Sequence, residues 1–289
     1  MTTVVIGRTG QVATCLQPLM PDAVFLDRQA LDLEQLDCIS DRLLALKPDF
    51  LINAAAYTAV DRAEEEPARA LRINGDAVRR IAETATAAGI PLVHLSTDYV
   101  FAGTQQAPYR EDDPTSPQTA YGRSKLAGEL AVRQSSLIHS WVFRTSWVFS
   151  HTGTNFVRTM LRLARERDEV RVVSDQHGIP TAAAHIATVL LDVRDRWVRG
   201  SPLPSGLYHL TSGGPATTWH GFAKKIFQLG YESEKLAGMP KLIPIATSEY
   251  PTLANRPANS VLESAKLRSA LGYRAESWET GLRSVIQQL

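Results

Sequence analysis

The sequence predicts an α/β protein, built on a doubly wound parallel sheet with a smaller α/β domain towards the C-terminus. Three observations lead to this prediction. Short continuous apolar runs alternate with longer amphipathic stretches, which is typical of βαβ units. A turn containing Gly7 and Gly10 joins the first apolar run to the first amphipathic stretch. After about residue 148 the alternation gives way to segments dense in proline and glycine.

The apolar runs of the first half are predicted to be parallel strands, because strands covered on both faces need no polar alternation. These runs are Val4–Ile6, Val24–Leu26, Phe50–Ile52, Leu92–Leu95 and Trp141–Phe143, and the predicted helices between them are Gln11–Met20, Glu34–Leu46, Pro67–Ala88 and Tyr121–Gln134. Further helices are expected at about 155–166, 182–196 and 218–229. We therefore predict one domain over 1–148, to which about 182–205 returns, and a second over 149–289.

Composition excludes several classes of protein. The 289 residues include 31 Lys and Arg against 30 Asp and Glu, a formal net charge of +1, which argues against a broad nucleic-acid-binding surface. No run of about 18 apolar residues predicts a membrane span. Cys15 and Cys38 are too few for a disulfide framework. The first residues lack the basic segment of a secretory signal, so we expect a cytoplasmic protein that binds neither nucleic acid nor membrane.

The turn after the first predicted strand is suited to binding a pyrophosphate. Gly7 permits a tight turn, and Gly10 lets backbone approach a ligand closely. Gln11 and Val12 then open a helix, whose free N–H groups and positive dipole end attract anions. Ala13 replaces the third glycine of the usual pattern, a substitution that the pattern allows. These features predict a Rossmann-type dinucleotide-binding domain.

The residues after the second predicted strand leave the choice of cofactor open. Asp27 is placed to bond a ribose 2′-hydroxyl, which favours NAD. Arg8 and Arg28 could instead pair with a 2′-phosphate, which favours NADP, or be ordinary surface charges. Asp32 and Leu33 precede the second helix, either beside the adenine or as a helix start with a core leucine. The cofactor is therefore predicted as NADPH or NADH.

Tyr121 and Lys125 are the candidate proton donor and its partner. Spaced four residues apart on a predicted helix, they lie one turn apart on one face. An ammonium group near a phenol favours the phenolate, so we expect Lys125 to lower the pKa of Tyr121. A phenol placed in this way can protonate a carbonyl oxygen while hydride arrives at the carbon. Lys125 could also hold the ribose hydroxyls of a nicotinamide cofactor.

The end of the fourth predicted strand supplies further candidates, because ligands bind at the carboxyl ends of strands in open α/β sheets. Thr97 or Ser96 could donate to the developing alkoxide, and Asp98 could bond a sugar hydroxyl or the turn backbone. Trp147 is placed either against a base or sugar or in the core. The histidines show neither HExxH nor paired spacing, so we predict no metal site.

Together these motifs resemble the extended short-chain dehydrogenase/reductases, and within them the reductases of dTDP-linked 4-keto sugars. The resemblance runs nearly the whole chain. Its segments are GRTGQ at 7–11, NAAAYTAVDRAEEEP at 53–67, STDYVF at 96–101, YGRSKLAGE at 121–129, RTSWVF at 144–149, NFVRTMLRLARER at 155–167, DQHGIPT at 175–181, GLYHL at 206–210 and RPANS at 256–260.

The resemblance implies an enzyme that reduces the C4 ketone of dTDP-6-deoxy-L-lyxo-4-hexulose to dTDP-β-L-rhamnose, a precursor of cell-surface polysaccharide, using NADPH or NADH. By the family pattern the catalytic residues are Thr97, Tyr121 and Lys125. The cofactor-binding residues implied are Gly10, Gln11, Val12, Asp27, Asp32, Leu33, Ala55, Ala56, Tyr57, Tyr121 and Lys125, to which the turn and charge arguments above add Gly7 and Arg28. The residues implied at the sugar nucleotide are Thr97, Asp98, Trp147, Asn155 and Arg256.

Departures from the family pattern bear on assembly. Some members form a homodimer bridged by Mg²⁺ through glutamates, one of them in the first helix. Here Cys15 is no ligand for a hard cation, Ala184 lacks a carboxylate, and the chain ends Gln287-Gln288-Leu289. Tyr57 stands where some relatives carry His. We therefore expect that any homodimer lacks this metal bridge.

Two alternative functions are weighed against the main one. The first is a reductase or epimerase acting on another nucleotide sugar, and an epimerase would retain its cofactor. The second is a non-catalytic regulatory subunit of methionine adenosyltransferase, a role found in a related branch. Intact Thr97, Tyr121 and Lys125 argue against the second, because binding alone needs no proton donor.

Overall fold

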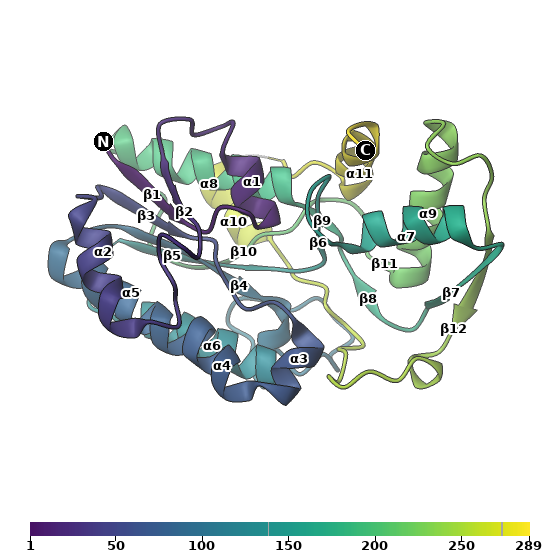
Figure 1. Cartoon of the computed structure of the whole chain (residues 1–289), viewed down its shortest axis with the longest axis horizontal. Helices are drawn as coiled ribbons and strands as arrows, with labels where there is room; N and C mark the ends of the chain where they lie inside the picture. The colour runs from purple at the N-terminus through teal and green to yellow at the C-terminus, as the bar shows by residue number, and fades with distance from the viewer. Residues whose placement is uncertain (138, 273) are drawn as a thin grey trace.

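The computed structural model describes residues 1–137, 139–272 and 274–289. Its centre is a six-stranded parallel sheet of order β10-β5-β4-β3-β1-β2 (Figure 1). The strands are β1 (Thr3–Ile6), β2 (Val24–Leu26), β3 (Phe50–Asn53), β4 (Leu92–Thr97), β5 (Ser140–Thr145) and β10 (Gly206–His209). The strand order reverses between β1 and β3, the type of switch point where open α/β sheets bind ligands. The predicted fold class is confirmed.

Helices cover both faces of this sheet, as Figure 1 shows. One face packs against α1 (Gln11–Leu16), α8 (Ala183–Val198) and α10 (Ala265–Leu271) through a shared apolar core. The other face packs against α2 (Ile39–Ala45), α5 (Ala77–Ala88) and α6 (Ala120–Arg133). Two short helices, α3 (Val60–Glu65) and α4 (Pro67–Leu71), lie against α6. The sheet is therefore buried on both sides, as its continuous apolar strands require.

A smaller lobe has its own apolar core. It contains the helices α7 (Phe156–Glu166), α9 (Trp219–Glu232) and α11 (Trp278–Gln287), and the paired strands β7 (Glu169–Val173) with β12 (Lys241–Ile245), β6 (Val148–Phe149) with β9 (Thr181–Ala182), and β8 (His177–Gly178) with β11 (Thr217–Thr218). The division of the chain near residue 148 stays a prediction. In support of a returning segment, α8, β10 and α10 all contribute side chains to the core of the large sheet.

Several helices differ from their predicted extents. The first ends at Leu16 rather than Met20, because Pro18 has no N–H to donate to the carbonyl four residues earlier. The stretch Pro67–Ala88 is not one α-helix, since a π-helical turn over Arg72–Asp76 separates α4 from α5. The predicted helix from Glu34 begins only as a 3₁₀ turn at Leu36–Cys38. Within the described ranges, no helix is both long and apolar enough to cross a membrane.

Candidate active site

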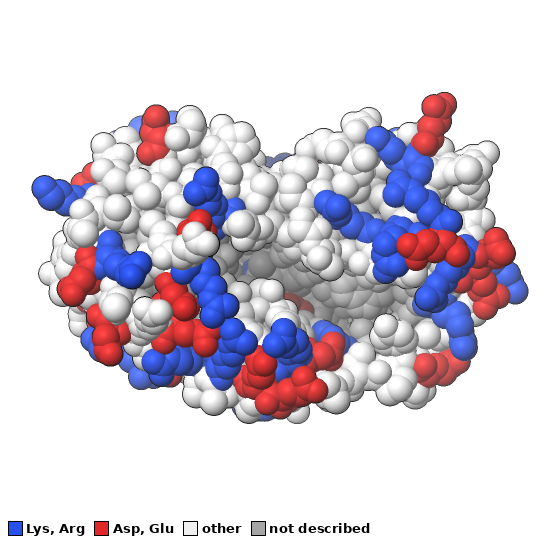
Figure 2. All heavy atoms as spheres, in the orientation of Figure 1, with Lys and Arg blue, Asp and Glu red and all other residues white. Residues whose placement is uncertain are grey.

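The candidate site lies where the loops after β1, β3 and β4 meet, at the carboxyl ends of neighbouring strands. Figure 2 shows a hollow between the large and small parts of the molecule, with charges of both signs along the lower edge of the large part. The pyrophosphate loop and the predicted catalytic residues come from different strands of one sheet. Parallel pairing of β1 with β3 and of β3 with β4 therefore brings their carboxyl ends to the same edge.

The loop after β1 has the geometry that a pyrophosphate-binding turn requires. Gly7 has φ +110°, and a Cβ there would lie 3.3 Å from the backbone of Ala54 and Ala55, so glycine lets the two loops approach closely. A Cβ on Gly10 would meet nothing within 4 Å, which leaves the start of α1 open. The buried Gln11 Oε1 atom has no partner among the described residues. These features fit a dinucleotide; Val12 is mostly buried.

The rim beside β2 carries alternating charges. Arg8 Nη1 lies 3.9 Å from Asp27 Oδ2, and the other oxygen of Asp27 accepts a bond from the Ala30 amide at 2.9 Å. Arg28 contacts both Asp32, at 3.6 Å, and Glu34. Glu34 follows the predicted pair Asp32-Leu33 and was not itself predicted as a site residue. Leu33 itself is 7% exposed and belongs to the core beneath the sheet.

The loop after β3 is held in place by one buried amide. The Tyr57 backbone amide donates to Asn74 Oδ1 at 2.8 Å, and Asn74 Nδ2 donates back to the Tyr57 carbonyl at 3.0 Å. Asn74 also bonds Ser124 on α6. This holds the end of the loop that carries Ala55, Ala56 and Tyr57, and their contacts with a cofactor stay a prediction. Asn74 was missed because an asparagine within an apolar helical pattern carries no distinctive signal.

Thr97 and Tyr121 come together at the end of β4. Thr97 Oγ1 donates to Asp98 Oδ1 at 2.9 Å, and the Thr97 side chain faces the Tyr121 phenol. Tyr121 is 9% exposed, and its ring packs edge-on against Tyr99 at 5.5 Å between centroids. Ser96 Oγ instead donates to the buried Glu129 at 2.9 Å. Of the two hydroxyls considered from the sequence, Thr97 is thus the one beside the phenol.

The pKa of Tyr121 corrects the expectation drawn from its spacing. Burial raises this pKa, with the nearby Asp98 adding to the rise and Thr97 opposing it. The ammonium group of Lys125 instead donates to the Leu95 carbonyl at 2.7 Å. Burial also lowers the pKa of Lys125 to about 8, against the opposing effect of Glu129. Desolvation therefore outweighs the predicted effect of helical spacing, and Tyr121 holds its proton firmly.

Asp98, next to Thr97, is also buried at this end of the crevice. It is 5% exposed, and its Oδ2 atom has no hydrogen-bond partner in the described part of the chain. Burial raises its pKa to about 6, with the nearby hydroxyl groups of Ser260 and Thr97 opposing the rise. A buried acceptor left open in this way is suited to a ligand hydroxyl.

An ion pair buried beneath the predicted catalytic residues was not anticipated from the sequence. Arg144 Nη2 donates to Glu129 Oε1 at 2.6 Å and Arg144 Nε donates to Oε2 at 2.9 Å, with both residues at most 1% exposed. Glu129 stands one turn after Lys125 on α6. The pair therefore ties α6 to β5, and Ser96 ties it to β4. Glu129 and Arg144 each lie in a segment quoted for the family resemblance. Whether they pair depends on which strands are neighbours in the sheet.

The remaining predicted substrate residues are placed unequally. Trp147 has a left-handed backbone (φ 50°) and stacks on Trp219 at 3.6 Å between centroids. Such a conformation in a bulky residue is often found at functional sites. Asn155 is mostly buried and caps α7, its Oδ1 accepting from the Arg158 amide at 3.3 Å. Arg256 is engaged by Asp61 and by the Tyr99 hydroxyl, which is 3.0 Å away.

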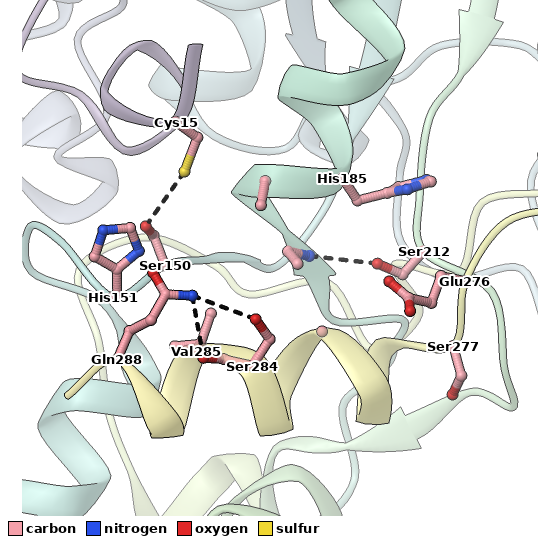
Figure 3. A pocket seen from close by; sticks show the side chains of 13 residues that line it. Cys15, Ser150, His151, His185, Ser212, Glu276, Ser277, Ser284, Val285 and Gln288 are labelled. Carbon is pink, nitrogen blue, oxygen red and sulfur yellow. Dashed lines mark hydrogen bonds between the residues drawn. The ribbon is translucent and has the colours of Figure 1, made fainter. Parts of the chain in front are cut away.

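The three positions that argue against a metal-bridged dimer line one cavity, which Figure 3 shows. Cys15, Ala184 and Gln288 contribute a thiol, a methyl group and an amide to it. The Cys15 thiol lies 3.8 Å from Ser150 Oγ, and burial raises its pKa. Mg²⁺ prefers oxygen ligands, carboxylates above all, and these three positions supply none, although Glu276 lines the same cavity. No group of three or more potential metal ligands occurs in the described ranges.

Comparison with known proteins places these features in context. The model of the RmlD substrate binding domain family matches residues 1–289. The dTDP-4-dehydrorhamnose reductase of Sinorhizobium fredii is 41% identical, over 99% of this chain and 96% of that protein. The enzyme of the same name from Escherichia coli K12 is 38% identical, over 100% and 98%.

Solved structures agree with this similarity. The dTDP-4-dehydrorhamnose reductase of Bacillus anthracis, in complex with NADP, superimposes with a TM-score of 0.90 at 33% identity, covering 100% of this chain and 99% of that one. The UDP-glucose 4-epimerase of Thermotoga maritima superimposes with a TM-score of 0.78 at 17% identity, over 100% and 98%. At that identity the likeness shows a shared fold alone.

Proposed function

The chain belongs to the RmlD substrate binding domain family, as its full-length match and its identity to several dTDP-4-dehydrorhamnose reductases show, and on this premise we propose its reaction. It reduces the C4 ketone of dTDP-4-dehydro-6-deoxy-L-mannose, which is the dTDP-6-deoxy-L-lyxo-4-hexulose named above, to dTDP-β-L-rhamnose with NADPH or NADH. The observation that carries the proposal is the buried pairing of Tyr121 with Thr97 at the end of β4, beside the open dinucleotide loop.

Each catalytic residue has a role that follows from its surroundings. Tyr121 gives its phenolic proton to the C4 oxygen, and its raised pKa keeps that proton in place until negative charge develops there. Thr97 Oγ1 donates a second hydrogen bond to the same oxygen once its hydroxyl proton turns away from Asp98 Oδ1. Lys125 supplies positive charge within the buried site and holds cofactor ribose hydroxyls. The bound nicotinamide supplies the hydride for C4.

Binding roles are proposed for the residues that line the crevice. The loop from Gly7 to Val12 holds the pyrophosphate. The residues on the rim of β2 hold the adenosine: Asp27, Arg28, Asp32 and Leu33. The residues after β3 line the cofactor: Ala55, Ala56 and Tyr57. Asp98 Oδ2 accepts from a sugar hydroxyl. Trp147 packs on the sugar, while Asn155 and Arg256 act near the sugar and diphosphate. We place the reaction in the cytoplasm, in keeping with two free cysteines.

The direct test combines the purified chain with the dTDP-linked 4-keto sugar and either reduced cofactor. We expect stoichiometric loss of NADPH or NADH absorbance and formation of dTDP-rhamnose, identified by NMR. The Tyr121→Phe variant is the matched negative control. Interconversion of sugar epimers with retained NAD and no net cofactor oxidation would instead indicate an epimerase and contradict the proposal.

A further inference from the structure

The rim cluster, formed by Arg28, Asp32, Glu34 and Arg69, joins the loop after β2 to α4. Its centre is a single carboxylate oxygen. Glu34 Oε1 accepts from Arg28 Nη2 and from both Nε and Nη2 of Arg69, the latter two at 3.2 and 2.9 Å. Asp32 Oδ1 lies 3.6 Å from Arg28 Nε. Two guanidinium groups from distant parts of the chain therefore converge on Glu34.

Glu34 is held more firmly than the arginine it faces. The Glu34 side chain is 27% exposed and that of Arg28 is 66% exposed. Arg72 Nε donates to the Glu34 backbone carbonyl at 2.7 Å, which holds the main chain as well. Arg69 is anchored from its other side by Glu66 at 3.2 Å. The Arg28 side chain is therefore exposed enough to rotate towards a ligand, but its hydrogen bond to Glu34 must break first.

The two cofactors differ chemically at the position that this rim faces. NADPH carries a 2′-phosphate of nearly two negative charges, and guanidinium forks bind phosphate with two parallel hydrogen bonds. NADH carries a hydroxyl there, which donates to a carboxylate such as Asp27. A guanidinium already paired with a carboxylate offers a phosphate less charge and fewer free donors. A phosphate at the rim would also face Glu34 itself.

We propose that Glu34 limits the preference for NADPH over NADH, by occupying the guanidinium groups of Arg28 and Arg69 that would otherwise receive the 2′-phosphate. The inference rests on the proposed function, since that function places the adenosine ribose beside Asp27. Glu34 acts here as an internal competitor of the phosphate. It is a specificity-determining residue and takes no part in the chemical step.

The test measures binding separately from turnover. Isothermal titration calorimetry gives Kd for NADP⁺ and NAD⁺ with the wild-type chain and with Glu34→Gln, which keeps the size of the side chain and removes its charge. We expect NADP⁺ to bind about tenfold more tightly in the variant, as for the loss of one repulsive charge near a surface. NAD⁺ affinity should change less than about threefold on the same reasoning. The NADP⁺ gain should shrink at high salt.

Two further variants separate the proposal from a general charge effect. Glu166→Gln removes a carboxylate of similar chemistry that pairs with Arg162 on α7, in the other lobe, and should leave both Kd values unchanged. Adding Arg28→Ala to Glu34→Gln should remove most of the NADP⁺ gain, because it removes the guanidinium that Glu34 released.

The outcomes divide cleanly between the two proposals. Equal changes in NADP⁺ and NAD⁺ affinity in Glu34→Gln, or a gain that persists without Arg28, would overturn the role of Glu34. Wild-type turnover of the dTDP-linked sugar with either cofactor decides the proposed function independently. The role of Glu34 can therefore fail while the reductase assignment stands.

Discussion

Lys125 and Asp98 at the catalytic end of the crevice are at most 5% exposed, whereas the side chains of Arg28 and Glu34 on the rim cluster are 66% and 27% exposed. At the catalytic end, burial lowers the pKa of Lys125 to about 8 and raises that of Asp98 to about 6. On the rim, charges pair with one another while still in contact with water. Burial thus controls protonation at one end, and pairing controls charge at the other.

This difference indicates how each end depends on mutation. A buried charge that is poorly solvated costs folding free energy. Mutations that change a charge at the catalytic end should therefore change the free energy of unfolding of the chain. An exposed pair is screened by solvent and salt, so changes on the rim cluster should alter ligand binding and leave stability nearly unchanged. The following predictions test this contrast, beginning with the largest effect.

Tyr121→Phe should lower kcat by roughly 10²–10⁴-fold, because it removes the proton donor and keeps the ring that packs on Tyr99. Steady-state kinetics gives the loss, and NADP⁺ titration should show nearly unchanged binding. Tyr231→Phe, at an exposed position on α9, is the matched control. Wild-type kcat in Tyr121→Phe would show that another group donates the proton.

Glu129→Gln should destabilise the fold by about 3–5 kcal/mol, because it leaves the Arg144 guanidinium buried without its counter-charge. Urea unfolding monitored by circular dichroism measures the change. Glu166→Gln, which breaks the surface pair with Arg162, should cost at most about 1 kcal/mol. If both variants lose the same small amount, burial does not set the value of these pairs.

Asp98→Asn should stabilise the chain by on the order of 1–3 kcal/mol near pH 7, since the raised pKa means that the ionised carboxyl disfavours folding. The ordinary pKa is 3.8 and the folded value is about 6. Between these values the folded chain keeps a proton that the unfolded chain releases, so wild-type stability falls as pH rises through that window.

Calorimetric unfolding at several pH values measures this effect. The advantage of Asp98→Asn should be small near pH 4, where the wild-type carboxyl is protonated, and should be complete above about pH 7. A difference that is constant from pH 4 to pH 8 would mean that ionisation of Asp98 is not its cause. Activity should fall in the same variant if the open Oδ2 atom accepts a sugar hydroxyl.

Treatment with EDTA should produce the smallest effect, with unchanged activity and unchanged oligomeric state. Cys15, Ala184 and Gln288 supply no carboxylate to the cavity that they line with Glu276, and Mg²⁺ prefers carboxylate oxygens. Kinetics and size-exclusion chromatography, each with and without EDTA, check both points. Activity lost on chelation and restored by Mg²⁺ would contradict the prediction that the enzyme works without Mg²⁺.

Sequence reasoning was most successful where a short pattern specifies local structure. The alternation of apolar runs with helices predicted β1 to β5 in order, and the turn at Gly7 was located without reference to any contact. It was less successful where neighbours along the chain are not neighbours in space. β10 follows the small-lobe elements in sequence, yet it pairs with β5 in the large sheet, and its short apolar run gave no signal of that pairing.

Local patterns in the sequence predicted the fold class, the dinucleotide loop and the candidates Tyr121 and Lys125, and left Thr97 and Ser96 as alternatives, because glycine conformations, strand periodicity and helical spacing are local properties. The assembled fold was needed to show that Ser96 bonds Glu129 while Thr97 faces Tyr121, and that Glu34 accepts from both Arg28 and Arg69. It also reversed the expected direction of the Tyr121 pKa shift. Desolvation and long-range ion pairing depend on which segments enclose a side chain, and that enclosure exists only once the sheet and its helices have assembled.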